Sequence, residues 1–93
     1  MSNSVRPQQL PQAAMIRAAR SLLGIDQAHL AVLVGVTVKT ISMIENTADE
    51  RKIDGRRRKI VERIGQRLRE EFDIEFVFPD SRNGIGVQIR KTT

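Results

Sequence analysis

Up to residue 72 the apolar residues of the chain recur at helical spacing. Between residues 12 and 23 they lie three and four positions apart, which predicts an amphipathic helix that ends at Gly24. The same spacing predicts a longer helix over residues 56–72, with Asp54 as its N-cap. The apolar stripe of this second helix consists of Ile60, Val61, Ile64, Leu68 and Phe72.

Two shorter helical patterns lie between these helices. Asp26 is a good N-cap for the first of them, which ends at Gly35, where glycine can take a positive φ without a Cβ clash. Thr37 then caps a helix that ends near Asn46. Two short helices joined by a tight turn predict a helix-turn-helix, whose second helix is the candidate for a DNA major groove. Ile41 and Ile44 share one face of that helix, which leaves Lys39, Thr40, Ser42, Met43 and Asn46 on its other faces.

The last twenty residues change period and predict a β-hairpin. Apolar and polar residues alternate over residues 74–78 and again over residues 85–90, and the segment between them ends in the turn-forming pair Asn83-Gly84. A two-stranded hairpin is only marginally stable by itself. We therefore expect its apolar face to lie on the helices, or its edge to pair with another chain.

Together these patterns predict a mainly α fold, a helix-turn-helix bundle of four to five helices with a C-terminal two-stranded β-hairpin. We expect a flexible N-terminal arm over residues 1–11, a DNA-binding domain over residues 12–73, and a hairpin over residues 74–93 that is a candidate dimerisation element. Ile53 is expected to anchor the loop before the long helix, and Gly65 to allow a close helix contact.

Charge adds a preference for polyanions. The 93 residues carry 16 Lys and Arg against 11 Asp and Glu, a net charge of +5, and this balance favours nucleic acid by long-range attraction. The unbroken basic run Arg56–Lys59 opens the long helix, where cations oppose the positive end of the helix dipole. Phosphate contact by Arg56, Arg57 and Arg58 explains this placement, and a solvated face relieved by Glu62 is the alternative.

Composition also excludes several classes of protein. There is no cysteine and one histidine, so we expect no disulfide, no metal site and no cofactor. No nucleophile is accompanied by a base, so we do not expect an enzyme. No apolar run approaches the roughly 18 residues that span a bilayer, and the N-terminus lacks a signal peptide, so we expect a cytoplasmic protein with no membrane contact.

A motif runs through residues 12–72. It consists of Arg20 before Leu22-Leu23-Gly24, then Gln27, Leu30-Ala31, Val34-Gly35, Thr37, and Ile41 to Glu45-Asn46. By this motif the region resembles the Xre family of helix-turn-helix regulators, which includes the lambdoid phage repressors. The C-terminal hairpin resembles an extension found in many small members of that family.

The resemblance implies roles for single residues. It implies that Gln27 contacts a DNA phosphate, that Thr40 faces the DNA backbone, and that Arg20 pairs with Glu45 to join two helices. It places Val38, Lys39 and Met43 at the base-reading positions and Asn46 near a phosphate. Capping and turn chemistry is the alternative for Thr40 and Asn46. The full set expected at the DNA is Gln27, Thr37, Val38, Lys39, Thr40, Ser42, Met43, Asn46, Arg56, Arg57 and Arg58.

The sequence also departs from the family pattern. Val38 and Met43 cannot donate hydrogen bonds to base edges, and Val32 and Leu33 stand where polar residues are usual. These four residues make an apolar surface of the kind that marks a protein partner. The alternative function is therefore a protein-binding antiactivator, or an antitoxin that both represses and binds a toxin.

The function expected from these observations is a sequence-specific transcriptional regulator that binds double-stranded DNA. We expect a homodimer, because one recognition helix buries little surface and two half-sites supply affinity. The first candidate for the dimer contact is the hairpin, through its edge or through Phe76, Phe78 and Val87. The second candidate is the helix over residues 56–72.

Overall fold

The computed structural model describes residues 10–47, 54–78 and 84–89. These residues contain four helices and a two-stranded antiparallel sheet, which confirms the mainly α class and the hairpin. The elements, in chain order, are α1 (Ala13–Leu23), α2 (Gln27–Val34), α3 (Val38–Glu45), α4 (Gly55–Phe72), β1 (Ile74–Val77) and β2 (Gly86–Ile89).

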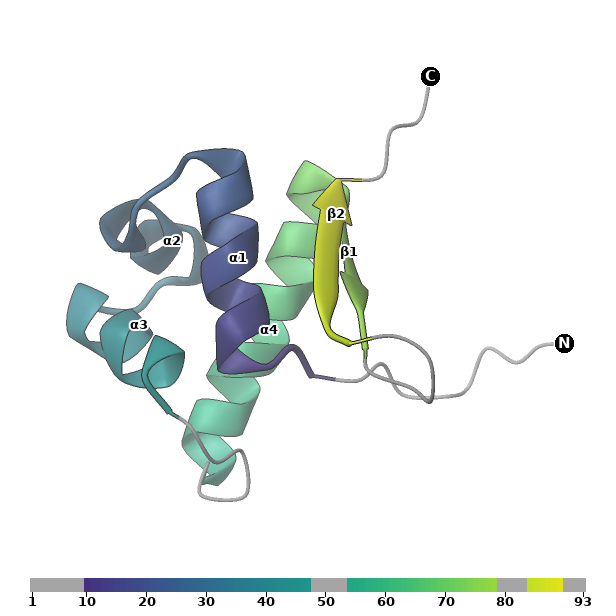
Figure 1. Cartoon of the computed structure of the whole chain (residues 1–93). Coiled ribbons are helices and arrows are strands. Elements are labelled where there is room, and N and C mark those ends of the chain that lie inside the picture. The colour runs from purple at the N-terminus through teal and green to yellow at the C-terminus, as the bar shows by residue number, and fades with distance from the viewer. Residues whose placement is uncertain (1–9, 48–53, 79–83, 90–93) are drawn as a thin grey trace, which may run out of the picture.

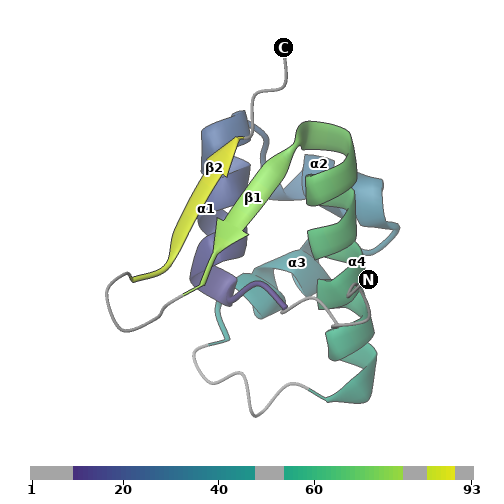
Figure 2. The same cartoon turned by 90° about the vertical axis from the view of Figure 1, so that its right-hand side faces the viewer.

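The elements are arranged on two sides of a central pair of helices. α1 and α4 lie in the middle, α2 and α3 lie on one side of them, and the hairpin lies on the other side (Figure 1). Figure 2 shows the hairpin from its outer face, with β2 in front of α1 and β1 beside α4. The hairpin and α3 are therefore separated by the full thickness of the helical layer.

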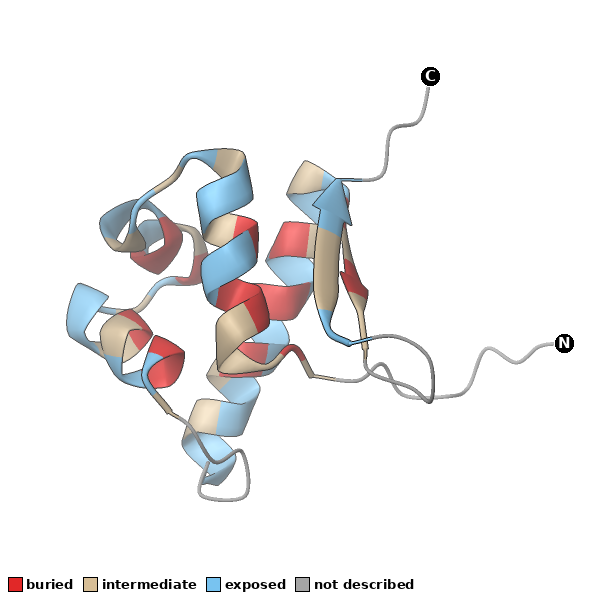
Figure 3. Ribbon diagram, in the orientation of Figure 1, coloured by how far each residue is buried: buried red, intermediate tan, exposed pale blue. Residues whose placement is uncertain are grey.

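One apolar core holds both sides together. The predicted stripes of α1, α3 and α4 face it, except for Leu22 of α1, which is 50% exposed. Figure 3 shows the buried segments turned toward the middle of the molecule. This burial removes the apolar faces of five elements from water at once, which is why none of the short helices needs to be stable alone. The buried apolar residues are Met15, Ile16, Ala19, Leu30, Ala31, Val34, Ile41, Ile44, Val61, Ile64, Leu68, Ile74 and Phe76.

Three predicted N-caps are confirmed. Asp26 accepts the backbone N–H of His29 at 2.8 Å and so begins α2. Thr37 Oγ1 accepts the N–H of Thr40 at 3.2 Å at the start of α3, and Asp54 accepts from the first turn of α4 at 2.9 Å. Each cap satisfies an N–H group that has no partner within its helix.

Three of the four helices, α1, α2 and α4, end in a left-handed residue that turns the chain sharply. Gly24 has a φ of 71° after α1, and Gly35 has a φ of 74° after α2, as the sequence predicts. Asp73, with a φ of 56°, ends α4 in the same conformation, which Asp tolerates better than most residues and which the sequence pattern did not predict. α2 and α3 are bent by 109° at the three-residue break between them.

The hairpin has a register that sets apolar residues opposite one another. Ile74 pairs with Ile89 and Phe76 with Val87, and both Ile74 and Phe76 are buried. Phe78 and Val87 also pack on the core of their own chain. The expectation that Phe76, Phe78 and Val87 offer a face to a partner is therefore corrected, because the helices already cover that face. Ile53 and Asn83 lie outside the described residues.

The end of the predicted N-terminal arm belongs to the core. Pro11 is buried and Leu10 packs against the apolar cluster, so the arm as predicted is too long, and residues 1–9 lie outside the described residues. A Cβ added to Gly65 would lie 3.2 Å from Pro11 Cδ, so the glycine accommodates this proline rather than another helix. The neighbouring Arg69 stacks over the Phe76 ring at 5.0 Å, and burial lowers its pKa.

We expect Gly35→Ala to lower the free energy of unfolding by about 1 kcal/mol, because an L residue is strained at this positive φ. Gly55→Ala is the matched control, since no atom lies within 4 Å of its added Cβ and its φ is not positive. This control should leave the stability unchanged or slightly raised. Urea denaturation measures both variants, and equal losses would contradict the role given to Gly35.

Candidate nucleic-acid interface

The outward face of α3 is defined by what α3 buries. Ile41, Ile44 and Glu45 face the core, so the positions of Lys39 and Met43 lie at the centre of the opposite side of the helix. Val38 lies at the edge of this side. Because the buried face carries all the packing, the outward face is free of a structural duty in the fold.

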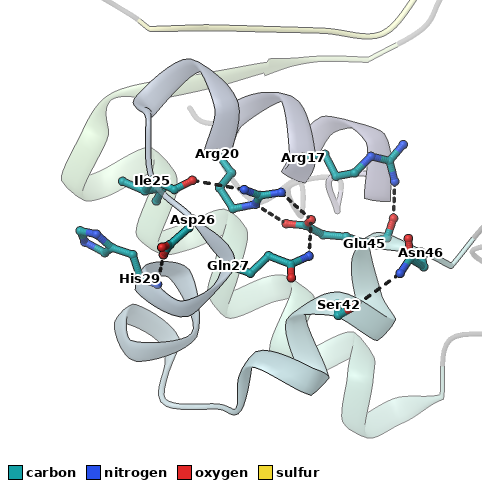
Figure 4. A network of polar contacts seen from close by, with 9 residues as sticks. All are labelled: Arg17, Arg20, Ile25, Asp26, Gln27, His29, Ser42, Glu45 and Asn46. Atoms are coloured by element: carbon teal, nitrogen blue, oxygen red, sulfur yellow. Dashed lines mark hydrogen bonds and ion pairs between the residues drawn. The ribbon is translucent and has the colours of Figure 1, made fainter.

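A buried carboxylate fixes α3 against two other helices. The Glu45 side chain is 1% exposed, and Arg20 of α1 holds it with Nε at 2.9 Å from one oxygen and Nη2 at 3.0 Å from the other (Figure 4). Gln27 at the start of α2 donates Nε2 to the same carboxylate at 3.0 Å. The Arg20–Glu45 pair is thus confirmed, and Gln27 has a structural role that sequence reasoning missed.

Each nitrogen of the Arg20 guanidinium donates a hydrogen bond at this junction. Its hydrogen bond to Glu45 raises its pKa above the ordinary arginine value, with a smaller contribution from the charge of Asp26. Its Nη1 also donates to the Ile25 carbonyl at 3.2 Å, in the turn between α1 and α2. The guanidinium therefore positions both the turn and the end of α3.

Two further arginines hold the C-terminal ends of α2 and α3. Arg17 of α1 donates to the backbone carbonyl of Glu45, and Arg63 of α4 donates to that of Val34 at 2.9 Å. A cation at the C-terminal end of a helix interacts favourably with the helix dipole. The spacing of Arg17 and Arg20 on one face of α1 offered a signal for the first contact, whereas nothing in the sequence points to the second.

The predicted base-reading residues are all on the surface. Val38 is 44% exposed and Met43 41% exposed, although both are apolar. Lys39 is exposed, and its side chain makes no hydrogen bond or ion pair with any described residue. These three side chains are therefore available to a partner.

The polar residues of α3 have local partners. Thr37 and Thr40 share a hydrogen bond between their hydroxyl groups at 3.0 Å. Asn46 donates to Ser42 Oγ at 3.4 Å across one turn of the helix. The capping and turn chemistry expected as the alternative for Thr40 and Asn46 is therefore present, and both side chains stay near the surface.

The basic first turn of α4 lies toward the same end of the molecule as the C-terminal end of α3. Both lie in the lower part of Figure 1. Arg56 and Arg58 are exposed, Arg57 is half-buried, and within the described part of the chain these side chains have no hydrogen bond or ion pair. In particular, the relief by Glu62 that the alternative required is not seen there.

Two of the three acidic residues of α4 lie at its opposite end. Glu70 and Glu71 are in the last turns of this helix of 18 residues, about 27 Å long, and Glu71 pairs with Arg67. Arg67 and Arg69 lie in the same part of the helix, so both charge signs are present there. The first turn of α4 contains cations and no acidic residue.

The apolar surface predicted on α2 is smaller than expected. Val32 is 81% exposed, but Leu33 is half-buried and packs against the core. Of the two residues, only Val32 is fully available to a protein partner.

The described residues show neither a metal-binding group nor a single membrane-spanning helix. Among residues 10–47, 54–78 and 84–89, no group of three or more acidic or histidine side chains is placed to hold a metal ion. No single helix of the described chain is long and apolar enough to cross a membrane, and the one pair that qualifies by length and composition, α2 with α3, is strongly bent.

Comparisons with known proteins add no family. No protein-family model matches the chain, and no curated protein and no solved structure matches it.

We expect Arg20→Ala to lower the free energy of unfolding by about 3 kcal/mol, because it leaves the buried Glu45 carboxylate without its main partner. Arg67→Ala is the matched control, since it removes an arginine from an exposed pair with Glu71 and should cost about 0.5 kcal/mol or less. Denaturant titration followed by circular dichroism compares the two. Similar losses in both variants would contradict the anchoring role.

Proposed function

We propose that the chain is a sequence-specific DNA-binding regulator of transcription, in which α2 and α3 form a helix-turn-helix and α3 enters the major groove. The observation that carries the proposal is the outward face of α3. Lys39 and Met43 lie on it and Val38 lies at its N-terminal edge, all three exposed and without a side-chain partner among the described residues. The buried side of the same helix is fixed by Glu45. The resemblance to the Xre family supports the same conclusion, and such a regulator acts in the cytoplasm, where its DNA is.

The dimensions of α3 suit this role. An α-helix with its side chains is about 10–12 Å in diameter, and the major groove is about 12 Å wide, so a helix such as α3 fits with its side chains against base edges. In this arrangement Lys39 reaches guanine N7 and O6. Thr37, Thr40, Ser42 and Asn46 border the base-reading residues and lie toward the DNA backbone.

Phosphate contacts come from two other elements. Gln27 uses one amide hydrogen for Glu45 and keeps the second for a phosphate at the N-terminal end of α2. Arg56, Arg57 and Arg58 in the first turn of α4, which have no ion pair among the described residues, supply the other cations. Such contacts position the protein without reading sequence, so they give affinity rather than specificity.

A protein-binding function is the second candidate. It is favoured by the exposure of Val32, Val38 and Met43, since apolar side chains at the surface are what a protein partner buries. An antiactivator would use this surface instead of DNA, and an antitoxin would bind both DNA and its toxin.

The proposal also includes a homodimer, formed through the edge of β2. Within the described residues β2 pairs with β1 alone, and residues 85–89 contain no charge and no proline to protect the other edge. Ile85 and Ile89 are 43% and 41% exposed beside it. Antiparallel pairing with the same edge of a second copy satisfies the free backbone groups and covers these side chains.

We expect the protein to bind a preferred duplex, selected from random DNA, with an affinity that falls steeply with salt. Lys39→Ala should weaken binding to the preferred duplex by about tenfold or more while leaving binding to random duplex nearly unchanged. Arg56→Gln is the contrasting variant. It should weaken binding to both duplexes alike and lower the salt slope by about 0.9.

Gel-shift titrations over a range of salt concentrations measure all these quantities. Equal loss of binding to both duplexes in Lys39→Ala would make Lys39 a phosphate contact. Absence of any shift at low salt would overturn the DNA-binding proposal and favour the protein-binding candidate.

We expect sedimentation equilibrium to give a mass twice the 10.5 kDa of the chain. Ile89→Lys should shift this mass to that of the monomer, because it places two charges at the two-fold contact. Val32→Lys is the matched control, since Val32 is on α2, and this variant should remain dimeric. A dimer that persists in Ile89→Lys would rule out the β2 edge.

A further inference from the structure

Two apolar side chains of α3, those of Val38 and Met43, do not pack on the core. Ile41 and Ile44 already supply the buried stripe of this helix, and both are fully or almost fully covered. Val38 lies in the first turn of α3, at the exposed end of the stripe, and Met43 lies opposite it, with more than a third of each residue open to water. Two exposed large apolar residues on a helix of eight residues need a reason other than packing.

The chemistry of the major groove supplies one. Base edges there present hydrogen-bond donors and acceptors at every base pair, and the only apolar group among them is the C5 methyl of thymine. Val38 has no hydrogen-bonding group in its side chain, and the Met43 sulfur is a weak acceptor, so neither can read a polar edge with any strength. Both side chains can instead bury the thymine methyl group through apolar contact.

We infer that Val38 and Met43 are specificity-determining residues that recognise thymine by its C5 methyl, on either side of the base contacted by Lys39. This inference rests on the proposed function. The two residues are five positions apart, which is about 7.5 Å along the helix axis and corresponds to about two base-pair steps. The preferred half-site therefore contains two thymine positions, with the guanine that Lys39 contacts between them.

The test replaces thymine with deoxyuridine, one position at a time, in the preferred duplex selected with the full-length protein. This exchange removes the methyl group and leaves every hydrogen-bonding group of the base in place. Burial of one methyl contributes about 0.8 kcal/mol, so binding should weaken by about fourfold at each recognised position. Uracil at the other thymine positions should have no effect.

Protein variants then assign each methyl to its side chain. Val38→Ala should abolish the uracil effect at one position and Met43→Ala at the other. Val32→Ala is the matched control, because it removes an exposed apolar side chain from α2 and should leave both effects intact. Lys39→Ala should weaken binding but also leave both effects, since it acts on a different base. Circular dichroism melting shows that each variant is folded, as expected for exposed positions.

The outcomes distinguish a failure of thymine recognition from a failure of the proposed DNA binding. Specific, salt-dependent binding that is insensitive to uracil at every position would overturn thymine recognition and leave the regulator in place. A uracil effect that survives both Val38→Ala and Met43→Ala would also overturn it, because another residue would then contact the methyl. Failure to bind any duplex at low salt would overturn the proposed function itself.

Discussion

The Glu45 carboxylate is the point at which α1, α2 and α3 are joined. It is buried, and a buried charge is tolerated only when its hydrogen-bonding capacity is met. Arg20 meets it from α1 and Gln27 from α2, so the two short helices are held at one angle by a set of directional bonds. Apolar packing brings these helices together, but it is less directional and specifies the angle less sharply.

Two groups of arginines among the described residues have different duties. Arg17, Arg20 and Arg63 link helices by binding carbonyl or carboxylate oxygens of their own chain. Arg56 and Arg58 lie at the surface without partners among the described residues. The net charge alone did not reveal this division, because it is made by tertiary contacts. Arg56 and Arg58 thus remain available in the first turn of α4, and they are the cations that the proposed DNA contact uses.

Local rules predicted most of the fold, and non-local contacts account for what they missed. Helix bounds and caps follow from spacing and from residues such as Thr37 and Gly35, so the sequence predicted them closely. The burial of Pro11 against Gly65 and the contact of Arg63 with Val34 join residues far apart in the chain, and no local pattern encodes them. At the candidate site, exposure of Lys39 and Met43 was predictable from helical periodicity. Their action on DNA stays a prediction.

The position of the hairpin has a consequence for symmetry. It forms an outer layer, and α3 lies on the opposite surface of the helical layer (Figure 1). If two chains continue one sheet through β2, the rotation axis relating them runs perpendicular to that sheet, because adjacent antiparallel strands keep the same face on the same side. The helices of both protomers then lie on the same side of the shared β-sheet. Their recognition helices point in the same direction around a dyad, and the matching DNA is an inverted repeat.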